Sequence, residues 1–211
     1  MAKIIGCVQV KGGAGRSTVS TNIVGTLSKQ HQTAIIDCDL PQGSTSSWCA
    51  LRTANGAMGN LSIATAESHN VLVSQVKRLS SLDYIVIDAP PRIEQITQTI
   101  IMIADLVVIP IGCTAVDVWA TTDLLATIEN FKQHKDQIDY RVLWNRYRNT
   151  RSANSLIEEI AEGGYPALNS KLGLRVAFSD AIAAGKTVNE TNDKKAGDEI
   201  DALLKEVTAL C

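Results

Sequence analysis

The chain alternates between short apolar runs and longer amphipathic segments. The apolar runs are rich in β-branched residues and almost continuously hydrophobic, which is typical of strands buried on both faces of a parallel sheet. They lie at Lys3–Val10, Thr33–Asp39, Leu61–Ala66, Tyr84–Asp88, Asp105–Pro110 and Tyr140–Trp144, and a last strand is predicted near 167–171.

The segments between these runs have apolar residues at helical spacing, as Val19, Ile23 and Leu27 show in the first of them. Because strands that alternate with helices form βαβ units, we expect an α/β fold: a doubly wound, mainly parallel sheet flanked by helices. Residues 1–211 are expected to form a single domain. Helices are predicted at Ser17–Lys29, Asn70–Leu79, Ile93–Ala104, Val116–Phe131 and Ser152–Ala161, with two more after the last strand.

The final predicted helix, Asp198–Leu210, has an acidic polar face opposite its leucines. A helix that lies on a membrane surface carries Lys and Arg on that face, so this helix is expected to pack on the domain. No apolar stretch reaches 18 residues, and a glycine loop interrupts the N-terminal apolar run too early for a signal peptide. These features predict a cytoplasmic protein without a membrane partner.

The cysteine content and the distribution of charge indicate which kinds of site the chain can hold. The five cysteines include no Cys-x-x-Cys pair, which argues against a disulfide framework and against a zinc site. The formal net charge is −2, so the total charge gives no reason to expect a nucleic-acid partner. Residues 141–195, however, contain nine basic and six acidic side chains and form a basic region.

A glycine-rich loop follows the first strand and leads directly into a helix. Its glycines allow backbone N–H groups to turn inward around an anion, and the helix N-terminus adds a positive dipole end. The loop is therefore a candidate phosphate site, in which the Ser17 hydroxyl is placed to bind Mg²⁺. The alternative is a glycine turn that only joins strand to helix. The loop reads Lys11, Gly12, Gly13, Ala14, Gly15, Arg16, Ser17 and Thr18.

Three aspartates lie at the carboxyl ends of predicted strands: Asp37, Asp39 and Asp88. In a doubly wound sheet this edge faces the crevice where nucleotides bind, and phosphoryl transfer needs Mg²⁺ and a group that orients water. A single aspartate at a strand end more often caps a helix. Three of them beside a phosphate loop favour the chemical roles.

The glycine loop resembles the deviant Walker A motif of the ParA/MinD family of ATPases, whose pattern is K-G-G-x-G-K-[ST]. The leading lysine makes the resemblance specific, because ordinary P-loops do not require a lysine there. The resemblance covers nearly the whole chain, since similar landmarks continue at 35–39, 41–44, 84–91, 107–110 and 145–146.

The resemblance implies a P-loop NTPase that binds ATP and Mg²⁺ and forms a homodimer around two ATP molecules. Lys11 would reach the phosphates of the partner, Asp39 would position the attacking water, and Asp37 and Asp88 would hold Mg²⁺ through its waters. Asn145 stands where this family reads the adenine edge, with a plain turn residue as the alternative. The resemblance also implies nonspecific DNA binding at the nucleoid, a partner protein that stimulates hydrolysis, and positioning of plasmid, chromosome or protein cargo.

Two residues depart from the family pattern. Arg16 replaces the second loop lysine, and its planar guanidinium is bulkier than an ammonium group. Leu40 lengthens the segment D-x-D-P-Q by one residue and can shift Asp39 relative to the attacking water. We expect ATP binding with slow turnover. The alternatives are a nucleotide-gated DNA-binding module with little or no hydrolysis, and a P-loop biosynthetic ligase, against which Lys11 counts.

Arginines cluster within residues 141–151, a stretch that contains no acidic residue but includes Trp144 and Tyr147. This pattern is typical of a nucleic-acid contact, because phosphate contacts need only correctly placed positive charge. The alternative is a solvated face with Trp144 in the core. The candidate DNA residues are Arg146, Arg148, Arg151, Lys171, Arg175 and Lys186.

Overall fold

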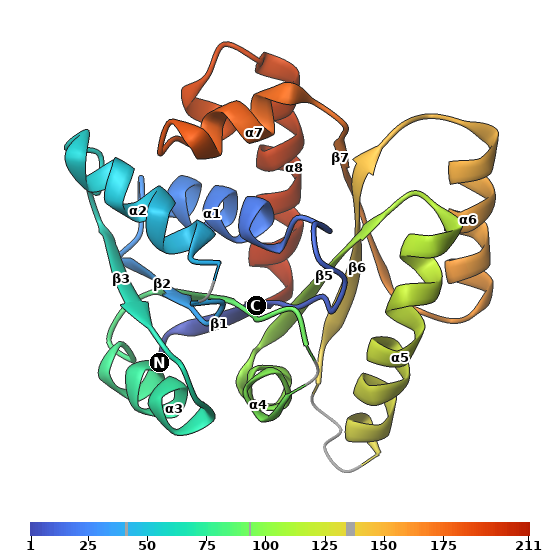
Figure 1. Cartoon of the computed structure of the whole chain (residues 1–211), viewed down its shortest axis with the longest axis horizontal. Coiled ribbons are helices and arrows are strands. Elements are labelled where there is room, and N and C mark those ends of the chain that lie inside the picture. The colour runs from blue at the N-terminus through green and yellow to red at the C-terminus, as the bar shows by residue number, and fades with distance from the viewer. Residues whose placement is uncertain (41, 93, 134–137) are drawn as a thin grey trace.

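The centre of the protein is one seven-stranded sheet with the strand order β3-β2-β4-β1-β5-β6-β7 (Figure 1). The computed structural model describes residues 1–40, 42–92, 94–133 and 138–211. Each of the six adjacent strand pairs is parallel. The strands are β1 (Lys3–Cys7), β2 (Thr33–Asp37), β3 (Leu61–Thr65), β4 (Tyr84–Asp88), β5 (Leu106–Gly112), β6 (Tyr140–Tyr147) and β7 (Ala167–Gly173).

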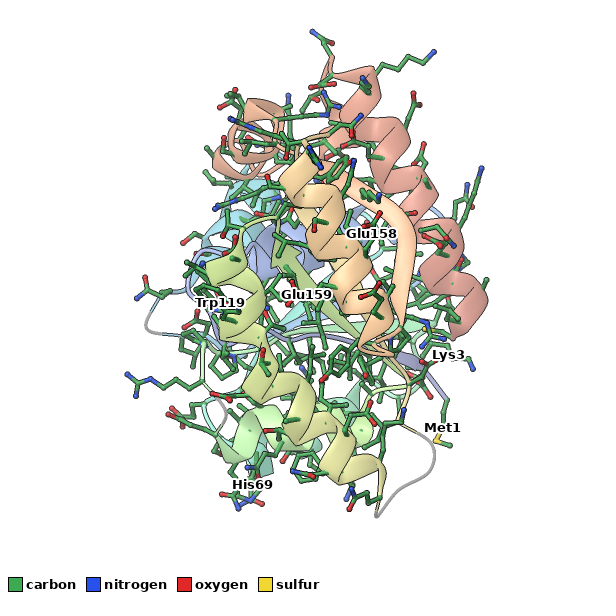
Figure 2. All side chains as sticks on the ribbon, turned by 90° about the vertical axis from the view of Figure 1, so that its right-hand side faces the viewer. Met1, Lys3, His69, Trp119, Glu158 and Glu159 are labelled. Carbon is green, nitrogen blue, oxygen red and sulfur yellow. The ribbon has the colours of Figure 1, made fainter. Side chains whose placement is uncertain are left out.

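Helices cover both faces of this sheet, which confirms the predicted doubly wound α/β architecture (Figure 1). One face carries α1 (Arg16–Leu27), α2 (Ser44–Ala54), α7 (Val176–Ala183) and α8 (Lys194–Leu210), with a 3₁₀ turn at Val188–Glu190. The other face carries α3 (His69–Arg78), α4 (Gln95–Ile103), α5 (Ala115–Lys132) and α6 (Arg151–Glu162). In Figure 2, Trp119 on α5 and Glu158 and Glu159 on α6 mark the outer side of this second layer.

Two hydrophobic cores lie against the two faces of the sheet. Alternate residues of a strand point to opposite faces, so Ile35 packs with the α1 and α8 layer and Ile36 with the α3 and α4 layer. All five residues of β2 are buried. Burial on both faces explains why the strands are apolar without interruption.

The structure differs from the sequence-based prediction at α2 and at β6. No helix was predicted over α2, because the serines and threonine of its first turn favour turns and caps in isolation. Burial of Trp48 and Cys49 in the core stabilises this helix. Strand β6 continues beyond Trp144 to Tyr147, so Asn145 lies within the strand and not in a turn after it. The alternative interpretation of Asn145 as a plain turn residue is therefore wrong.

The C-terminal helix α8 packs on the sheet as predicted, with Ile200, Leu203 and Val207 fully buried. Among the described residues, none of the helices combines the length and the apolar character needed to cross a bilayer. Pro41, in the family-like segment after Asp39, and Ile93, at the start of the predicted helix Ile93–Ala104, lie outside the described residues. That residues 1–211 form one domain stays a prediction.

Candidate functional site

The phosphate loop connects β1 to α1 at the carboxyl edge of the sheet. Gly13 and Gly15 adopt φ of 75° and 99°, a backbone conformation that side chains with a Cβ rarely allow. The loop is tied at its start by Gln9, whose Oε1 accepts from the backbone N–H groups of Val10 and Lys11 at 2.8 and 3.2 Å. The amide of Gln9 in turn donates to Thr121 of α5 at 2.9 Å, so the loop and α5 are held together.

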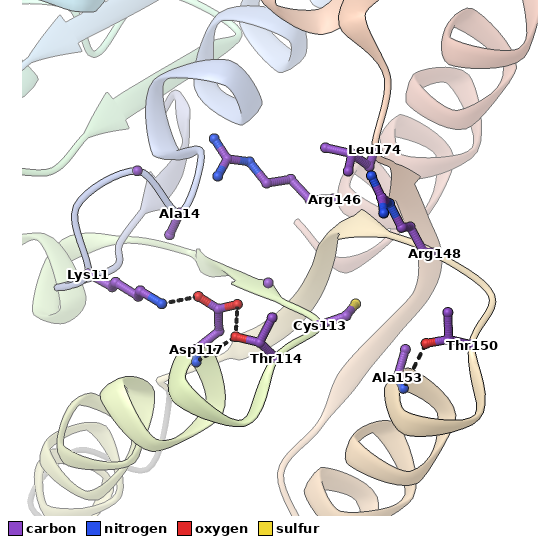
Figure 3. Close-up of a pocket in the computed structure, with 12 residues that line it drawn as sticks. Lys11, Ala14, Cys113, Thr114, Asp117, Arg146, Arg148, Thr150, Ala153 and Leu174 are labelled. Atoms are coloured by element: carbon purple, nitrogen blue, oxygen red, sulfur yellow. Dashed lines mark hydrogen bonds and ion pairs between the residues drawn. The ribbon is translucent and has the colours of Figure 1, made fainter.

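A cleft of about 420 Å³ opens over this loop. Its lining includes the loop residues from Gly12 to Thr18 except Ala14, together with Asp39 and Arg146. A second cavity of about 500 Å³ lies beside Ala14, and Lys11, Asp117 and Arg148 line it together with Arg146 (Figure 3). The two cavities together offer space for a phosphate chain and a nucleoside.

Arg16 is buried beneath the loop and contacts the aspartate predicted to position water. Its Nη1 donates to the carbonyl oxygen of Gln9, and its Nη2 lies 3.4 Å from Asp39 Oδ2. The Nε of Arg16 has no hydrogen-bond partner among the described residues. The loop cation and Asp39 therefore belong to one charged cluster at the floor of the cleft.

Lys11 points to α5 and forms an ion pair with Asp117 in the first turn of that helix (Figure 3). Asp117 also accepts a 2.5 Å hydrogen bond from Thr114 Oγ1. Burial raises the pKa of Asp117, but the hydrogen bonds from Lys11 and Thr114 outweigh it and hold the pKa below its ordinary value. The leading lysine is thus paired within its own chain.

Asp37 and Asp88 end neighbouring strands at the same register position and are both buried. Asp88 Oδ2 accepts from Thr45 Oγ1 at 2.6 Å, whereas its Oδ1 is buried without a partner among the described residues. Asp37 Oδ2 accepts from the backbone N and Oγ of Ser46 at 2.9 and 2.6 Å. Burial raises the pKa of Asp88 to about 6, while the hydrogen bond from Thr45 and the nearby Ser17 hydroxyl act in the opposite direction.

This donor set fits a magnesium ion that also binds phosphate. Mg²⁺ in nucleotide sites keeps several waters and takes one or two protein oxygens besides the phosphates. The unpartnered Oδ1 of Asp88 and the nearby Ser17 hydroxyl are oxygens of this kind. No group of three or more His, Cys, Asp or Glu side chains in the described ranges could hold a metal by itself. The protein would therefore supply only part of the coordination.

Asn145 is buried beneath the phosphate loop, with both ends of its side chain engaged. Its Nδ2 donates to Ala14 O at 2.8 Å, and its Oδ1 accepts from the N–H of Arg146 at 2.9 Å. Arg146 has a φ of 55°, which is unusual for a residue other than glycine. Asn145 therefore fixes the loop to β6, and its predicted contact with adenine stays a prediction.

Gly15→Ala is expected to destabilise the protein and to distort this tether. An added Cβ would lie 2.1 Å from Asn145 Nδ2 at a φ of 99°. Such strain costs about 1–3 kcal/mol. Thermal unfolding should show a Tm lower by about 2–4 °C for each kcal/mol. Gly12→Ala is the matched control, because its Cβ would meet no atom within 4 Å. Equal Tm values for the two variants would contradict the tether.

The candidate DNA residues differ in solvent exposure and in whether they form ion pairs within the protein. Arg146, Arg148, Arg151 and Lys186 are exposed. Arg175 forms a 2.7 Å ion pair with Glu199, and this hydrogen-bonded pairing raises the pKa of Arg175.

Two further residues of the basic region also have internal roles. Lys171 Nζ lies 4.7 Å from the centre of the Tyr147 ring. Trp144 is fully buried in the core, as the alternative interpretation expected of this side chain, and the role of the exposed arginines in DNA binding stays a prediction.

Sequence reasoning missed four residues that contact the predicted site: Gln9, Thr45, Ser46 and Asp117. Gln9 is a buried polar residue directly before a glycine loop, and Thr45 and Ser46 begin a helix after a strand-end aspartate. From these positions the sequence could have suggested that Gln9 holds the glycine loop and that Thr45 and Ser46 bind the aspartate carboxylates. Nothing local in the sequence pairs Asp117 with Lys11, because 106 residues separate them.

Comparisons with known proteins found a family match to part of the chain, sequence relatives and solved structures with the same fold. A family described as an AAA domain matches residues 56–140. The chain is 28% identical over 208 residues to maintenance of carboxysome distribution protein A of Halothiobacillus neapolitanus, covering 94% of this chain and 93% of the relative.

Two solved structures share the fold. Apo McdA of Cyanothece superposes with a TM-score of 0.82 at 17% identity, over 99% of this chain and 100% of that one. The cell division ATPase MinD of Pyrococcus furiosus gives a TM-score of 0.76 at 16% identity, with full coverage of both chains.

Proposed function

The sequence relatives and the shared fold support assignment of this chain to the ParA/MinD family of deviant Walker A ATPases, and on that basis we propose an ATP-driven positioning cycle. The protein binds ATP with Mg²⁺, forms a homodimer around two ATP molecules, binds DNA without sequence preference and returns to the monomer after hydrolysis. The observation that carries this proposal is the cleft in which the glycine loop, Arg16 and Asp39 meet.

The residues of the cleft support hydrolysis by position and charge. The loop N–H groups and the N-terminus of α1 bind the phosphates, and Asp39 orients the attacking water. Ser17, together with Asp37 and Asp88 acting through waters, would hold Mg²⁺, which would neutralise charge at the phosphates. In the monomer Lys11 pairs with Asp117, and in the dimer it leaves Asp117 and contacts a phosphate of the second protomer.

Phosphate release over time, with and without duplex DNA, tests the hydrolysis step. Turnover that requires Mg²⁺ supports an ATPase. The second candidate is a nucleotide-gated module that binds ATP and DNA with little hydrolysis. The contact between Arg16 and Asp39 favours this module, because the guanidinium engages the carboxylate that is proposed to position the attacking water. ATP-dependent DNA binding without phosphate release would select this module.

Arg16→Lys is expected to raise the turnover number by about tenfold, equivalent to ~1.4 kcal/mol of the barrier. A lysine ammonium is smaller, and it can follow the phosphate oxygens as charge develops in the transition state. It would also release Asp39 from the guanidinium contact. Turnover is measured at saturating ATP and Mg²⁺ for both proteins. A slower lysine variant would mean that the arginine is adapted to this site.

DNA binding is proposed to use the exposed arginines around β6 and α6, with Lys186 as a further contact. Among the residues that the structure describes, Arg148 and Arg151 form no ion pair, whereas Arg175 is paired with Glu199. A dimer presents each of these charges twice, so ATP should raise the affinity for DNA. Phosphate contacts of this kind carry no sequence information.

Replacing Arg148 and Arg151 together by Ala should weaken DNA binding and flatten its salt dependence. Each lost phosphate contact reduces the slope against log salt by roughly 0.9. Gel shifts on two unrelated duplexes at three salt concentrations measure this slope. Lys77 and Arg78, both exposed on α3, provide the matched double-alanine control. An equal effect in the control, or a preference for one duplex, would contradict the assignment of this surface.

The cargo-positioning part of the proposal is supported by the H. neapolitanus relative, whose name states carboxysome distribution. By analogy, this chain would work in the cytoplasm on the nucleoid, with an adaptor protein that links it to a cargo and stimulates hydrolysis. Fluorescence imaging of the tagged protein should show ATP-dependent association with the nucleoid. Uniform cytoplasmic signal in the presence of functional ATPase would contradict this part.

A further inference from the structure

One face of helix α2 contacts two separate parts of the molecule. Thr45, Trp48, Arg52 and Asn55 follow one another at intervals of three, four and three residues, which places them in one row along the helix. Thr45 contacts Asp88 at the magnesium-binding edge. The other three residues contact the chain after α7. Helix α2 therefore spans the distance between the nucleotide cleft and the C-terminal region.

Three successive carbonyl groups at the end of α7 accept hydrogen bonds from this row. Asn55 Nδ2 donates to Ala184 O at 3.2 Å. Arg52 Nη1 donates to Gly185 O at 3.1 Å, and Trp48 Nε1 donates to Lys186 O at 2.9 Å. These three donors satisfy backbone carbonyl groups in the turn that follows α7, which belong to no helix or strand.

The same turn is fastened by a charge pair and by close packing. Arg52 forms a two-point ion pair with Glu190, at 2.7 and 3.1 Å, and Glu190 in turn accepts from the N–H of Thr187 at 2.8 Å. Gly185 has a φ of 66°, and a Cβ there would lie 2.7 Å from Leu51 Cβ and 2.8 Å from Arg52 N. Residues 184–190 therefore have little freedom to move independently of α2.

The first turn of α2 is equally tied to the two buried acids. Thr45 and Ser46 donate to Asp88 and Asp37 at 2.6 Å through their hydroxyl groups. A cation bound to these carboxylates draws their negative charge toward itself and weakens the hydrogen bonds that they accept. The first turn of α2 is thus the part of the fold that responds directly to occupancy of the site.

We propose that α2 couples magnesium and nucleotide binding to the turn at residues 184–186, and thereby sets the position of Lys186 toward a DNA phosphate. This inference rests on the proposed function and names how its DNA contact is regulated. Lys186 is exposed, while its carbonyl is held by Trp48, so movement of the helix moves this backbone and the charge that it carries. A packed helix with interlocked contacts at both ends transmits a shift because it does not deform continuously.

Hydrogen exchange on the whole chain tests the coupling without relying on turnover. The N–H groups of Gly185, Lys186 and Val188 all have hydrogen-bond partners, so their exchange is slow enough to follow. We expect MgATP to change the exchange rates of residues 185–188 by about tenfold, a coupling of ordinary size. ATP with EDTA should produce a smaller change, because the acids are then not engaged by a cation.

Two variants cut the connection and a third serves as control. The double variant Trp48→Phe/Asn55→Ala removes two of the three hydrogen-bond donors to residues 184–186 and keeps the Arg52–Glu190 ion pair. The single variant Asn55→Ala removes one donor, at an exposed residue, and is therefore milder. Both should bind MgATP as the parent does, but their exchange response at 185–188 and the ATP stimulation of DNA binding should fall. Asn60→Ala, which removes a side-chain contact with Gln32 far from this turn, should respond like the parent.

The outcomes separate failure of the coupling from failure of the proposed function. If calorimetry shows MgATP bound while residues 185–188 of the parent do not respond, the coupling is wrong and the nucleotide site stands. A parent-like response in both cut variants also overturns the coupling. If the parent binds no MgATP, the proposed function fails and the coupling fails with it.

Discussion

Asp39→Ala should abolish most ATP turnover while ATP binding and dimer formation persist. Loss of a group that orients or deprotonates the nucleophile lowers the rate by about 10²–10⁴-fold. The loop that binds phosphate does not depend on this side chain, because Gln9 and Asn145 hold it. The contact of Asp39 with Arg16 would be lost, leaving the guanidinium free for phosphate. Phosphate release gives the rate, and light scattering in ATP shows whether dimers accumulate.

Asp123→Ala on the exposed side of α5 is the matched control for this variant, since it removes the same group away from the cleft. It should leave turnover unchanged. If Asp39→Ala hydrolyses ATP as fast as the parent, the extra residue Leu40 has moved Asp39 away from the water, and another group orients it. If the variant fails to bind ATP, Asp39 supports the loop and not the chemistry.

Lys11→Ala should leave ATP binding largely intact and prevent dimer formation. In the proposed dimer Lys11 contacts the phosphates of the second protomer, and loss of one partner of a buried charged contact costs about 2–5 kcal/mol. The dimer dissociation constant should rise by about 30- to 5,000-fold on that scale. Light scattering across a concentration series in ATP measures this change.

The corresponding control is Lys29→Ala, an exposed lysine just beyond the end of α1. Its dimerisation should equal that of the parent. The stability of the Lys11→Ala monomer is a second readout. Loss of the Lys11–Asp117 ion pair at this partly exposed site should lower the free energy of unfolding only slightly. Equal dimerisation of Lys11→Ala and the parent would remove the deviant Walker assignment of the loop.

Local sequence was enough to identify the strands and the phosphate loop. A strand buried on both faces must be apolar throughout, so β2 and β4 could be located within two residues of their ends. The loop was recognisable because Gly13 and Gly15 adopt positive φ, a requirement that acts on each residue by itself. Aspartates at strand ends could likewise be placed at one edge, because parallel strands align their carboxyl ends.

Long-range packing determined the remainder. Helix α2 has a first turn of serines and threonine, and it is helical because Trp48 is buried and its hydroxyls meet Asp37 and Asp88. Asn145 and Ala14 are 131 residues apart, and Lys11 and Asp117 are 106 apart. Hydrogen bonds and ion pairs of this kind depend on which side chains the folded sheet brings within about 3 Å of each other. No periodicity in the chain encodes those partners, so they emerge only when the sheet and its helices have packed.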